Sequence, residues 1–392
     1  MHTANNPLAC LVTIHGISFQ QPPQPALGLP GYADGLHQHL SKYLTPSILG
    51  DDPQRSRSQR GENGPIYVQS CWPLESGNSE QGLVRLGQWS TDIRHIDCIS
   101  APLTAENARI AHIALVYSPL EEEKAQVGAG FVAGSMSLAR MSHYAHITGL
   151  MHLLLSDGLA ISRHHTTNNV QPGTNLIPRH TSATTPIGHH SNGLLTVMRN
   201  LEDDVAAYVS HNGQRERIRE FVYKALLRLA ARNDVTSIII NAHSNGTVIA
   251  LDVLRQLPTC AALKIKAIVT AGSPLRKYVD LFHWGQQIES TIAIPPWLNF
   301  WDEYDPVADP LAPPLSWHHS DPIPSPCKPS LFQYIDSNTG TVSNIDIKDI
   351  QVDNLTHSYG GGLQAHNYWD NEEEFVKPLA GLLLRLTVHK SS

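Results

Sequence analysis

A serine lies between a predicted strand and a predicted helix in the second half of the chain. Residues 235–241 form a short β-branched run, as expected for a strand buried on both faces. Residues 246–257 carry apolar side chains at helical spacing and stop before a proline. Ser244 falls in the turn between them, with the small residues Ala242 and Gly246 two positions away on either side. A sharp turn of this kind strains the backbone, needs small neighbours and exposes the serine oxygen as a nucleophile. The alternative is a small-residue turn in which the serine is incidental.

Two backbone segments could lie close to a bound substrate. The backbone N–H of Asn245 lies beside Ser244 at the predicted helix N-terminus. Much earlier, the apolar run 8–14 is followed directly by His15-Gly16-Ile17. A glycine at that position lets the backbone approach a substrate closely. The chain therefore offers a nucleophile with a backbone N–H beside it, and a second segment that a substrate could approach closely.

Together these motifs resemble those of the α/β-hydrolase family. The family pattern around the serine is Gly-x-Ser-x-Gly, and this chain departs from it by having Ala242 in the first position. The resemblance covers roughly residues 8–117 and 201–386. It implies a mostly parallel sheet with helices on both faces, plus a helical or irregular insertion that acts as a cap or lid. It also implies an oxyanion hole made by the N–H groups of Ile17 and Asn245, and a reaction that needs no cofactor and no metal ion.

An activated serine needs a base to accept its proton and an acid to orient that base. In α/β-hydrolases the acid and then the histidine follow the serine along the chain. Asp305 follows the apolar run 297–301 in an Asp-Pro-Val context that resembles the acid loop of this family. Asp302 and Asp309 are alternatives on the same segment. Asp305 could also be a turn aspartate that caps its own backbone.

His366 is predicted as the base because it lies in a loop before the last predicted helix, where the family places its histidine. His357, across a glycine-rich loop, is one alternative, and the pair His318-His319 is another. Without a catalytic role, His366 would be a surface histidine packed against its two aromatic neighbours. His243, beside the serine, is expected to have a structural role with its side chain directed away from the pocket.

The other predicted elements must bring these residues to one edge of a sheet. Helical and strand patterns alternate along the chain, which favours βαβ units and a parallel sheet. Further predicted strands are 66–71, 110–117 and 265–270, and a hairpin is formed by 331–335 and 341–347. The predicted helices are 33–44, a pair in 201–229 that is broken near Asn212-Gly213, and a closing helix in 372–386 that is interrupted near Pro378.

Residues 126–162 have an unusual composition, with Arg140 and Asp157 as the only charged side chains. The stretch is either a pair of core helices or a lid whose apolar face covers an acyl pocket, because so large an exposed apolar surface would promote aggregation. The expected organisation is an N-terminal part of the sheet core in 1–120, the insertion in 121–199, and a C-terminal part with the reactive residues in 200–392. In the lid interpretation, the acyl chain is bound by Phe131, Leu150, Met151 and Leu154.

Composition excludes several classes of protein. The net charge of −7 and the lack of a basic stripe argue against a nucleic-acid partner. Five scattered cysteines without a Cys-x-x-Cys pair indicate neither a zinc ribbon nor a disulfide framework. The first residues lack a signal-peptide pattern and no segment has the length of a membrane span, so a cytoplasmic location is expected. The polar segment 164–192 contains five histidines and is predicted to be a mobile loop, with metal binding as the alternative.

The sequence thus predicts a serine hydrolase that cleaves small-molecule carboxylic esters through an acyl-enzyme. A lipase or lysophospholipase that contacts a lipid surface transiently through the insertion is the alternative with the same chemistry. A hydrolase-fold binding protein that has lost catalysis is the alternative from another class. The oligomeric state, the acyl length and the alcohol do not follow from the sequence.

Overall fold

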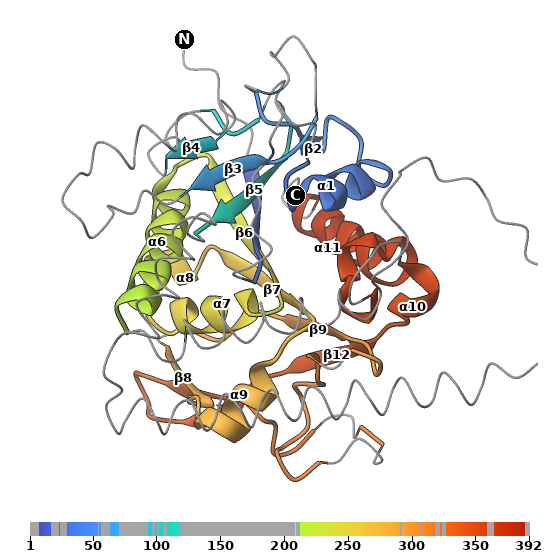
Figure 1. The fold of residues 1–392 in the computed structure, drawn as a ribbon. Helices are drawn as coiled ribbons and strands as arrows, with labels where there is room; N and C mark the ends of the chain where they lie inside the picture. The colour runs from blue at the N-terminus through green and yellow to red at the C-terminus, as the bar shows by residue number, and fades with distance from the viewer. Residues whose placement is uncertain are drawn as a thin grey trace, which may run out of the picture.

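The centre of the protein is a parallel β-sheet (Figure 1). The computed structural model describes residues 8–16, 30–53, 63–69, 93–95, 108–117, 212–290, 292–305, 307–317, 327–358 and 364–388, together with residues 23, 55, 99, 102–104, 208, 322 and 323. Within this part of the chain, nine strands form one sheet in which all strand pairs are parallel. The strands are β1 (Leu8–Ile14), β2 (Leu49–Gly50), β3 (Ile66–Gln69), β4 (Ile93–His95), β5 (Ile110–Val116), β6 (Val235–His243), β7 (Ile265–Ala271), β9 (Trp297–Trp301) and β12 (Ile347–Gln351).

The order of the strands creates a switch point in the middle of the sheet. The order is β12-β9-β7-β6-β1-β5-β3-β4, and β2 pairs with β5. From β1 the chain first builds the half that contains β2 to β5, and then the half that begins with β6. The direction of building therefore reverses between β1 and β6, which are paired neighbours. In open α/β sheets, ligands bind in the crevice at the carboxyl ends of the two strands at such a point.

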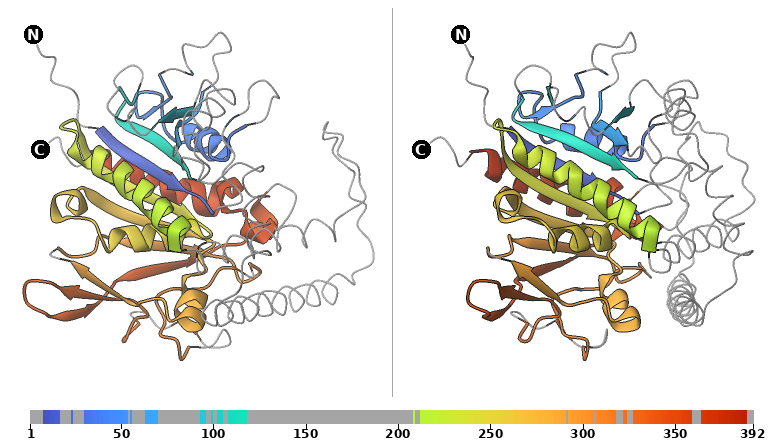
Figure 2. Two further views of the ribbon diagram at one scale, coloured as in Figure 1. Left: turned by 60° about the vertical axis from the view of Figure 1, so that its left-hand side comes forward. Right: turned by 90° about the vertical axis from the view of Figure 1, so that its left-hand side faces the viewer.

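Helices cover both faces of this sheet, as the views in Figure 2 show. On one face α6 and α7 pack on Val12 and its same-side neighbours, and on the other face α1 and α11 pack on Leu11 and its same-side neighbours. Consecutive residues of β1 thus belong to different cores, because side chains alternate along a strand. The predicted α/β class and mostly parallel sheet are confirmed. The bounds are α1 (Asp34–Ser41), α6 (Asn212–Ala231), α7 (Gly246–Leu254) and α11 (Lys377–Val388).

A smaller sheet of three strands contains the predicted hairpin. β10 (Gln333–Asp336) and β11 (Val342–Asn344) pair antiparallel, and β8 (Gln287–Ser290) pairs with β10. The hairpin is confirmed, but its second arm ends at Asn344 and does not reach 347. Ile347 instead begins β12, because the chain crosses to the main sheet and pairs with β9 there.

The predicted closing helix is present, and near Pro378 it changes type without a break. A single π-helical turn covers Glu372–Val376, and the regular helix α11 begins at Lys377. Pro378 therefore lies where the π-helical turn passes into α11, and it has no N–H to donate to the preceding turn. The helix α6 is described from Asn212 onward, and the break predicted near that residue borders positions outside the described residues. The remaining helices are α8 (Thr259–Ala262), α9 (Leu275–Phe282) and α10 (Asn354–His357).

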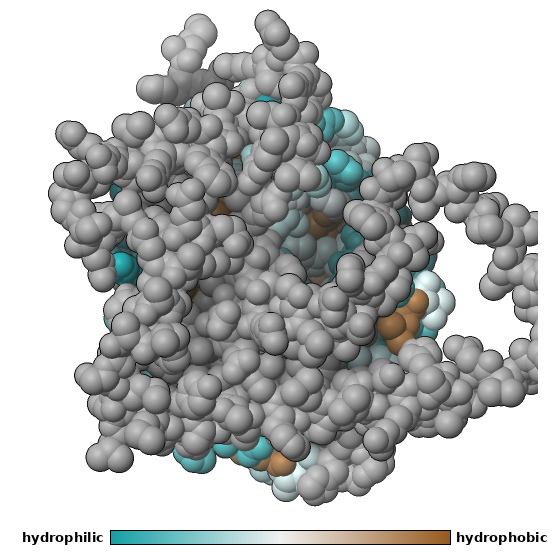
Figure 3. Space-filling model, in the orientation of Figure 1, coloured by the Kyte–Doolittle hydropathy of each residue, from teal (hydrophilic) through white to brown (hydrophobic). Residues whose placement is uncertain are grey.

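The predicted insertion lies outside the described residues. Positions 118–207 are not described. The predicted cap or lid, the domain boundaries at 120 and 200 and the histidine-rich segment all fall within this range. Within the described helices, none combines the length and the apolarity needed to cross a membrane. The described surface visible in Figure 3 is mainly hydrophilic, with hydrophobic residues in small separate areas. Single exposed apolar residues are ordinary for a protein surface.

Candidate active site

The turn after β6 is strained at the serine, as predicted. Ser244 has a φ of 55°, a left-handed conformation that is rare for residues other than glycine. Its backbone N–H donates to the carbonyl oxygen of Ala271 at 3.0 Å, which ties the turn to the end of β7. The helix α7 starts at Gly246, where a Cβ atom would lie 2.4 Å from the carbonyl oxygen of Ile14. A glycine is therefore required there, since α7 starts against the end of β1.

The same close approach brings the His15-Gly16 segment to the serine. A Cβ atom on Gly16 would lie 3.2 Å from Oγ of Ser244 and 3.4 Å from the backbone nitrogen of Asn245. The ends of β1 and β6 thus place Gly16, the serine hydroxyl and the Asn245 N–H together. Asn245 is buried, and its side-chain Oδ1 accepts a hydrogen bond of 2.7 Å from the hydroxyl of Tyr278. Ile17, the other predicted oxyanion donor, lies outside the described residues.

Asp305 and His366, which are 61 positions apart in the chain, form a buried hydrogen-bonded pair. Nδ1 of His366 lies 2.7 Å from Oδ2 of Asp305. The same carboxylate accepts hydrogen bonds of 2.9 Å from the Tyr368 hydroxyl and from the backbone N–H of Val307. Because a carboxylate accepts all three bonds, Nδ1 of His366 carries the proton in the neutral ring. Nε2 of His366 is then a lone-pair acceptor, and this buried atom has no hydrogen-bond partner among the described residues.

The two alternative aspartates, Asp302 and Asp309, have partners other than His366. Burial raises the pKa of Asp302 to about 7, although its two oxygens accept hydrogen bonds from the backbone N–H groups of Tyr304 and Asn354. Asp309 forms a buried ion pair of 2.6 Å with Lys277. Both carboxylates thus have other partners, and Asp305 is the one that contacts His366. The prediction also missed Tyr368, which donates to Asp305 and whose oxygen accepts from the N–H of Asp302.

The alternative histidines lie elsewhere. His357 is partly exposed, with its nearest acidic group, the carboxylate of Glu374, at 4.0 Å. His318 and His319 are outside the described residues. His366 is buried, so the description of it as a surface histidine is wrong, although Tyr368 does pack edge-on against its ring at 6.2 Å. Among the histidines that the structure describes, His366 alone pairs with Asp305.

The ring of His366 lies against residues that surround the serine. Gly272 directly follows Ala271, the residue whose carbonyl holds the Ser244 N–H. A Cβ atom on Gly272 would lie 2.6 Å from Cε1 and 2.8 Å from Nδ1 of His366. Gly272 also has a φ of 59°, a conformation that glycine adopts without strain. The end of β7 therefore has a glycine where the imidazole packs on the backbone.

A pair of histidines, His15 and His243, lies next to the serine turn. The sequence did not predict this pair. Nδ1 of His243 lies 3.1 Å from Nε2 of His15, and Nε2 of His243 lies 2.9 Å from the carbonyl oxygen of His366. Burial lowers the pKa of His15 to about 3 and that of His243 well below its ordinary value. Both rings are therefore neutral near pH 7. The close association of two imidazoles depends on strands β1 and β6 being neighbours, which no local sequence pattern reveals.

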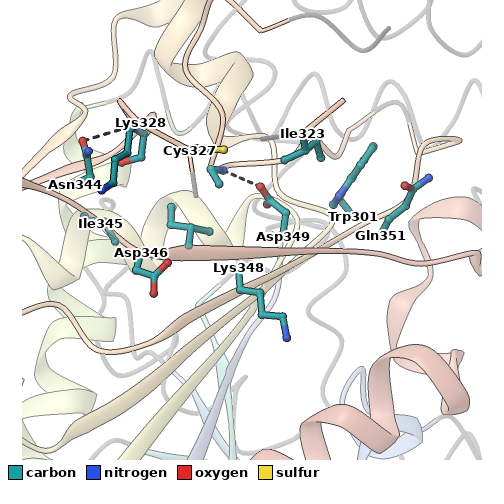
Figure 4. A pocket seen from close by; sticks show the side chains of 13 residues that line it. Trp301, Ile323, Cys327, Lys328, Asn344, Ile345, Asp346, Lys348, Asp349 and Gln351 are labelled. Carbon is teal, nitrogen blue, oxygen red and sulfur yellow. Dashed lines mark hydrogen bonds between the residues drawn. The ribbon is translucent and has the colours of Figure 1, made fainter. Parts of the chain in front are cut away.

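The four predicted acyl-binding residues, Phe131, Leu150, Met151 and Leu154, lie outside the described part of the chain. A hollow of about 780 Å³ occurs at the edge strand β12, and none of the predicted reactive residues lines it. Asp349 and Lys348 project to opposite sides of β12 there (Figure 4). The Asp349 carboxylate is held by the backbone N–H groups of Leu311 and Ala312, each at 2.8 Å. This carboxylate therefore has a structural role.

Comparisons of the chain with protein-family models, with curated proteins and with solved structures give no match. The described residues contain no group of three or more side chains that could hold a metal ion. The site is therefore interpreted from its own geometry.

Proposed function

We propose that the protein is a serine hydrolase that cleaves carboxylic esters through an acyl-enzyme. The observation that carries the proposal is the buried His366, whose Nδ1 donates to Asp305 and whose Nε2 has no partner among the described residues. A histidine held in this tautomer can accept a proton from a hydroxyl group. Ser244, in the strained turn at the end of β6, supplies such a hydroxyl.

The position of the site in the fold supports the proposal. Ser244 and Gly16 follow β6 and β1, the two strands between which the strand order reverses. Asp305 follows β9 and His366 precedes α11, so four separate segments converge at the carboxyl edge of the sheet. The finer assignment to the α/β-hydrolase fold is part of this proposal, because it rests on the motifs and on this arrangement.

In the proposed reaction, Oγ of Ser244 attacks the acyl carbon of the ester as its proton moves to Nε2 of His366. The backbone N–H of Asn245, with that of Ile17, stabilises the negative charge on the former carbonyl oxygen. His366 then gives the proton to the leaving alkoxide, and an alcohol departs while the acyl group stays on the serine. Water repeats the sequence in the second half: His366 accepts its proton, hydroxide attacks the acyl carbon, and the carboxylic acid and the free serine result. Asp305 keeps the imidazole in the required tautomer throughout.

The test is the turnover of p-nitrophenyl esters of increasing acyl length, with labelling by a fluorophosphonate as a second measurement. Ser244→Ala should abolish labelling, and both Ser244→Ala and His366→Ala should lower turnover by about 10⁴-fold or more. His357→Ala is the matched histidine control and should keep wild-type turnover. Labelling that persists in Ser244→Ala, or turnover lost in His357→Ala and kept in His366→Ala, would refute the assignment. A folded wild-type protein without turnover or labelling would favour a binding protein.

A further inference from the structure

His243 forms a direct link between the serine turn and the loop that carries His366. Its Nε2 lies 2.9 Å from the carbonyl oxygen of His366. A carbonyl oxygen only accepts hydrogen bonds, so Nε2 of His243 carries the proton of the neutral ring. Nδ1 of His243 is then an acceptor that lies 3.1 Å from Nε2 of His15, while Nδ1 of His15 lies 3.2 Å from the carbonyl oxygen of Gly16. The carbonyl group of His366 thus determines the tautomer of the His243 ring.

Aromatic packing holds the two rings in this orientation. The ring of Trp369 meets that of His15 edge-on at 4.9 Å and lies 5.2 Å from that of His243. Tyr32 stacks on Trp369 and meets His15 edge-on at 5.5 Å. His243 also lies 4.5 Å from the ring of His366 itself. Because both histidines are buried among these rings, neither can reorient without disturbing the packing.

The link has a mechanical consequence. His243 and Ser244 are consecutive residues, so the bond to the His366 carbonyl joins the backbone of the nucleophile to the backbone of the base. The bond to Asp305 holds the imidazole at Nδ1. A ring held at Nδ1 alone can still swing with its loop. A second anchor on the backbone of the same residue removes that freedom.

We propose that His243, supported by His15, is a positioning residue that sets the place of the His366 imidazole relative to Oγ of Ser244. This inference rests on the proposed function, since it concerns the distance over which a proton moves between those two groups. His243 would thus affect the rate of the reaction as well as the structure of the turn. His243 does not touch the substrate in this role.

The experiment compares His243→Gln with His243→Asn. The amide nitrogen of glutamine can occupy the place of Nε2 and donate to the His366 carbonyl. Asparagine is shorter, so its amide lies near the place of Nδ1, faces His15, and cannot reach that carbonyl. We expect His243→Asn to lower kcat for p-nitrophenyl acetate by about 10²-fold, the usual cost of a 1 Å misplacement, with KM changed less than about twofold. His243→Gln should recover kcat to within about fivefold of the wild type.

Equal kcat values for folded Gln and Asn variants, whether high or low, would overturn the proposal. A purely structural role would lower the melting temperature without separating the two variants in kcat. A second measurement needs no variant: long-range ¹H–¹⁵N spectra of the wild-type protein should show the proton of His243 on Nε2, and a proton on Nδ1 would also overturn the proposal. If the wild type shows no turnover that depends on Ser244, the proposed function fails, while the spectrum still decides whether the histidine link exists.

Discussion

The packing of Gly272 on the imidazole of His366 allows a quantitative prediction. In Gly272→Ala, the new Cβ would lie 2.6 Å from Cε1 of His366, whereas ordinary contacts begin near 3.4 Å. The ring must therefore move by about 0.8 Å, or the end of β7 must move by the same amount. A displacement near 1 Å costs about 10²-fold in rate when a proton must pass between fixed groups. We expect kcat for p-nitrophenyl acetate to fall by roughly that factor.

The substitution also affects stability, because Gly272 has a φ of 59°. A side chain in the left-handed region costs about 1–2 kcal/mol. Gly340, in the turn between β10 and β11, is a matched control: its φ is 68°, and a Cβ atom there would have nothing within 4 Å. Gly340→Ala should lose the free energy of backbone strain alone, as measured by unfolding in urea, and keep its kcat. The control thus separates backbone strain from the contact with the imidazole.

Two results would refute this reasoning. A folded Gly272→Ala protein with kcat within twofold of the wild type would show that the ring does not need its observed place. An equal loss of kcat in Gly340→Ala would show that the effect comes from strain and not from the contact. Fluorophosphonate labelling rates should follow kcat in both variants, since the same base activates the serine in both reactions.

Three further predictions concern the elements that support the site. Thr13→Val removes the hydroxyl that lies 2.8 Å from Nε2 of the buried His112, and should lower the free energy of unfolding in urea by about 1–3 kcal/mol; no change would mean that another group satisfies this nitrogen. Gly246→Ala places a Cβ 2.4 Å from the Ile14 carbonyl oxygen and should cost at least about 1–3 kcal/mol, so a loss within about 0.5 kcal/mol would contradict the close approach of α7 to β1. Burial lowers the pKa of His15 to about 3, so between pH 6.5 and 3 the unfolded chain binds a proton there that the folded chain does not. The free energy of unfolding is therefore not reduced by His15 above pH 6.5. Below that pH it falls by about 1.4 kcal/mol per pH unit, because the unfolded chain takes up the proton. His15→Gln should remove that part of the slope in urea unfolding between pH 6.5 and 5, and an unchanged slope would refute the assignment.

Much of the fold follows from local patterns of the sequence. The buried strands β1, β5, β6 and β7 appear as β-branched or apolar runs, because strands covered on both faces have no polar side to present. The strained turn at Ser244 is marked by Ala242 and Gly246, because its steric demands fall on residues close in sequence. The irregularity of the last helix near Pro378 is predictable for the same reason, since proline acts on its own turn of the helix.

The tertiary structure decides the rest, because the contacts join residues far apart in the chain. The acidic segment offers Asp302, Asp305 and Asp309 within one loop, and only the packing of β9 against neighbouring segments shows which carboxylate faces His366. The pairing of His15 with His243 requires β1 and β6 to be adjacent, although 228 positions separate the two residues. A sequence read alone fixes the periodicity of each element and the steric demands of each turn. Which side chains meet depends on strand order and register, and these are set by the burial of the whole sheet.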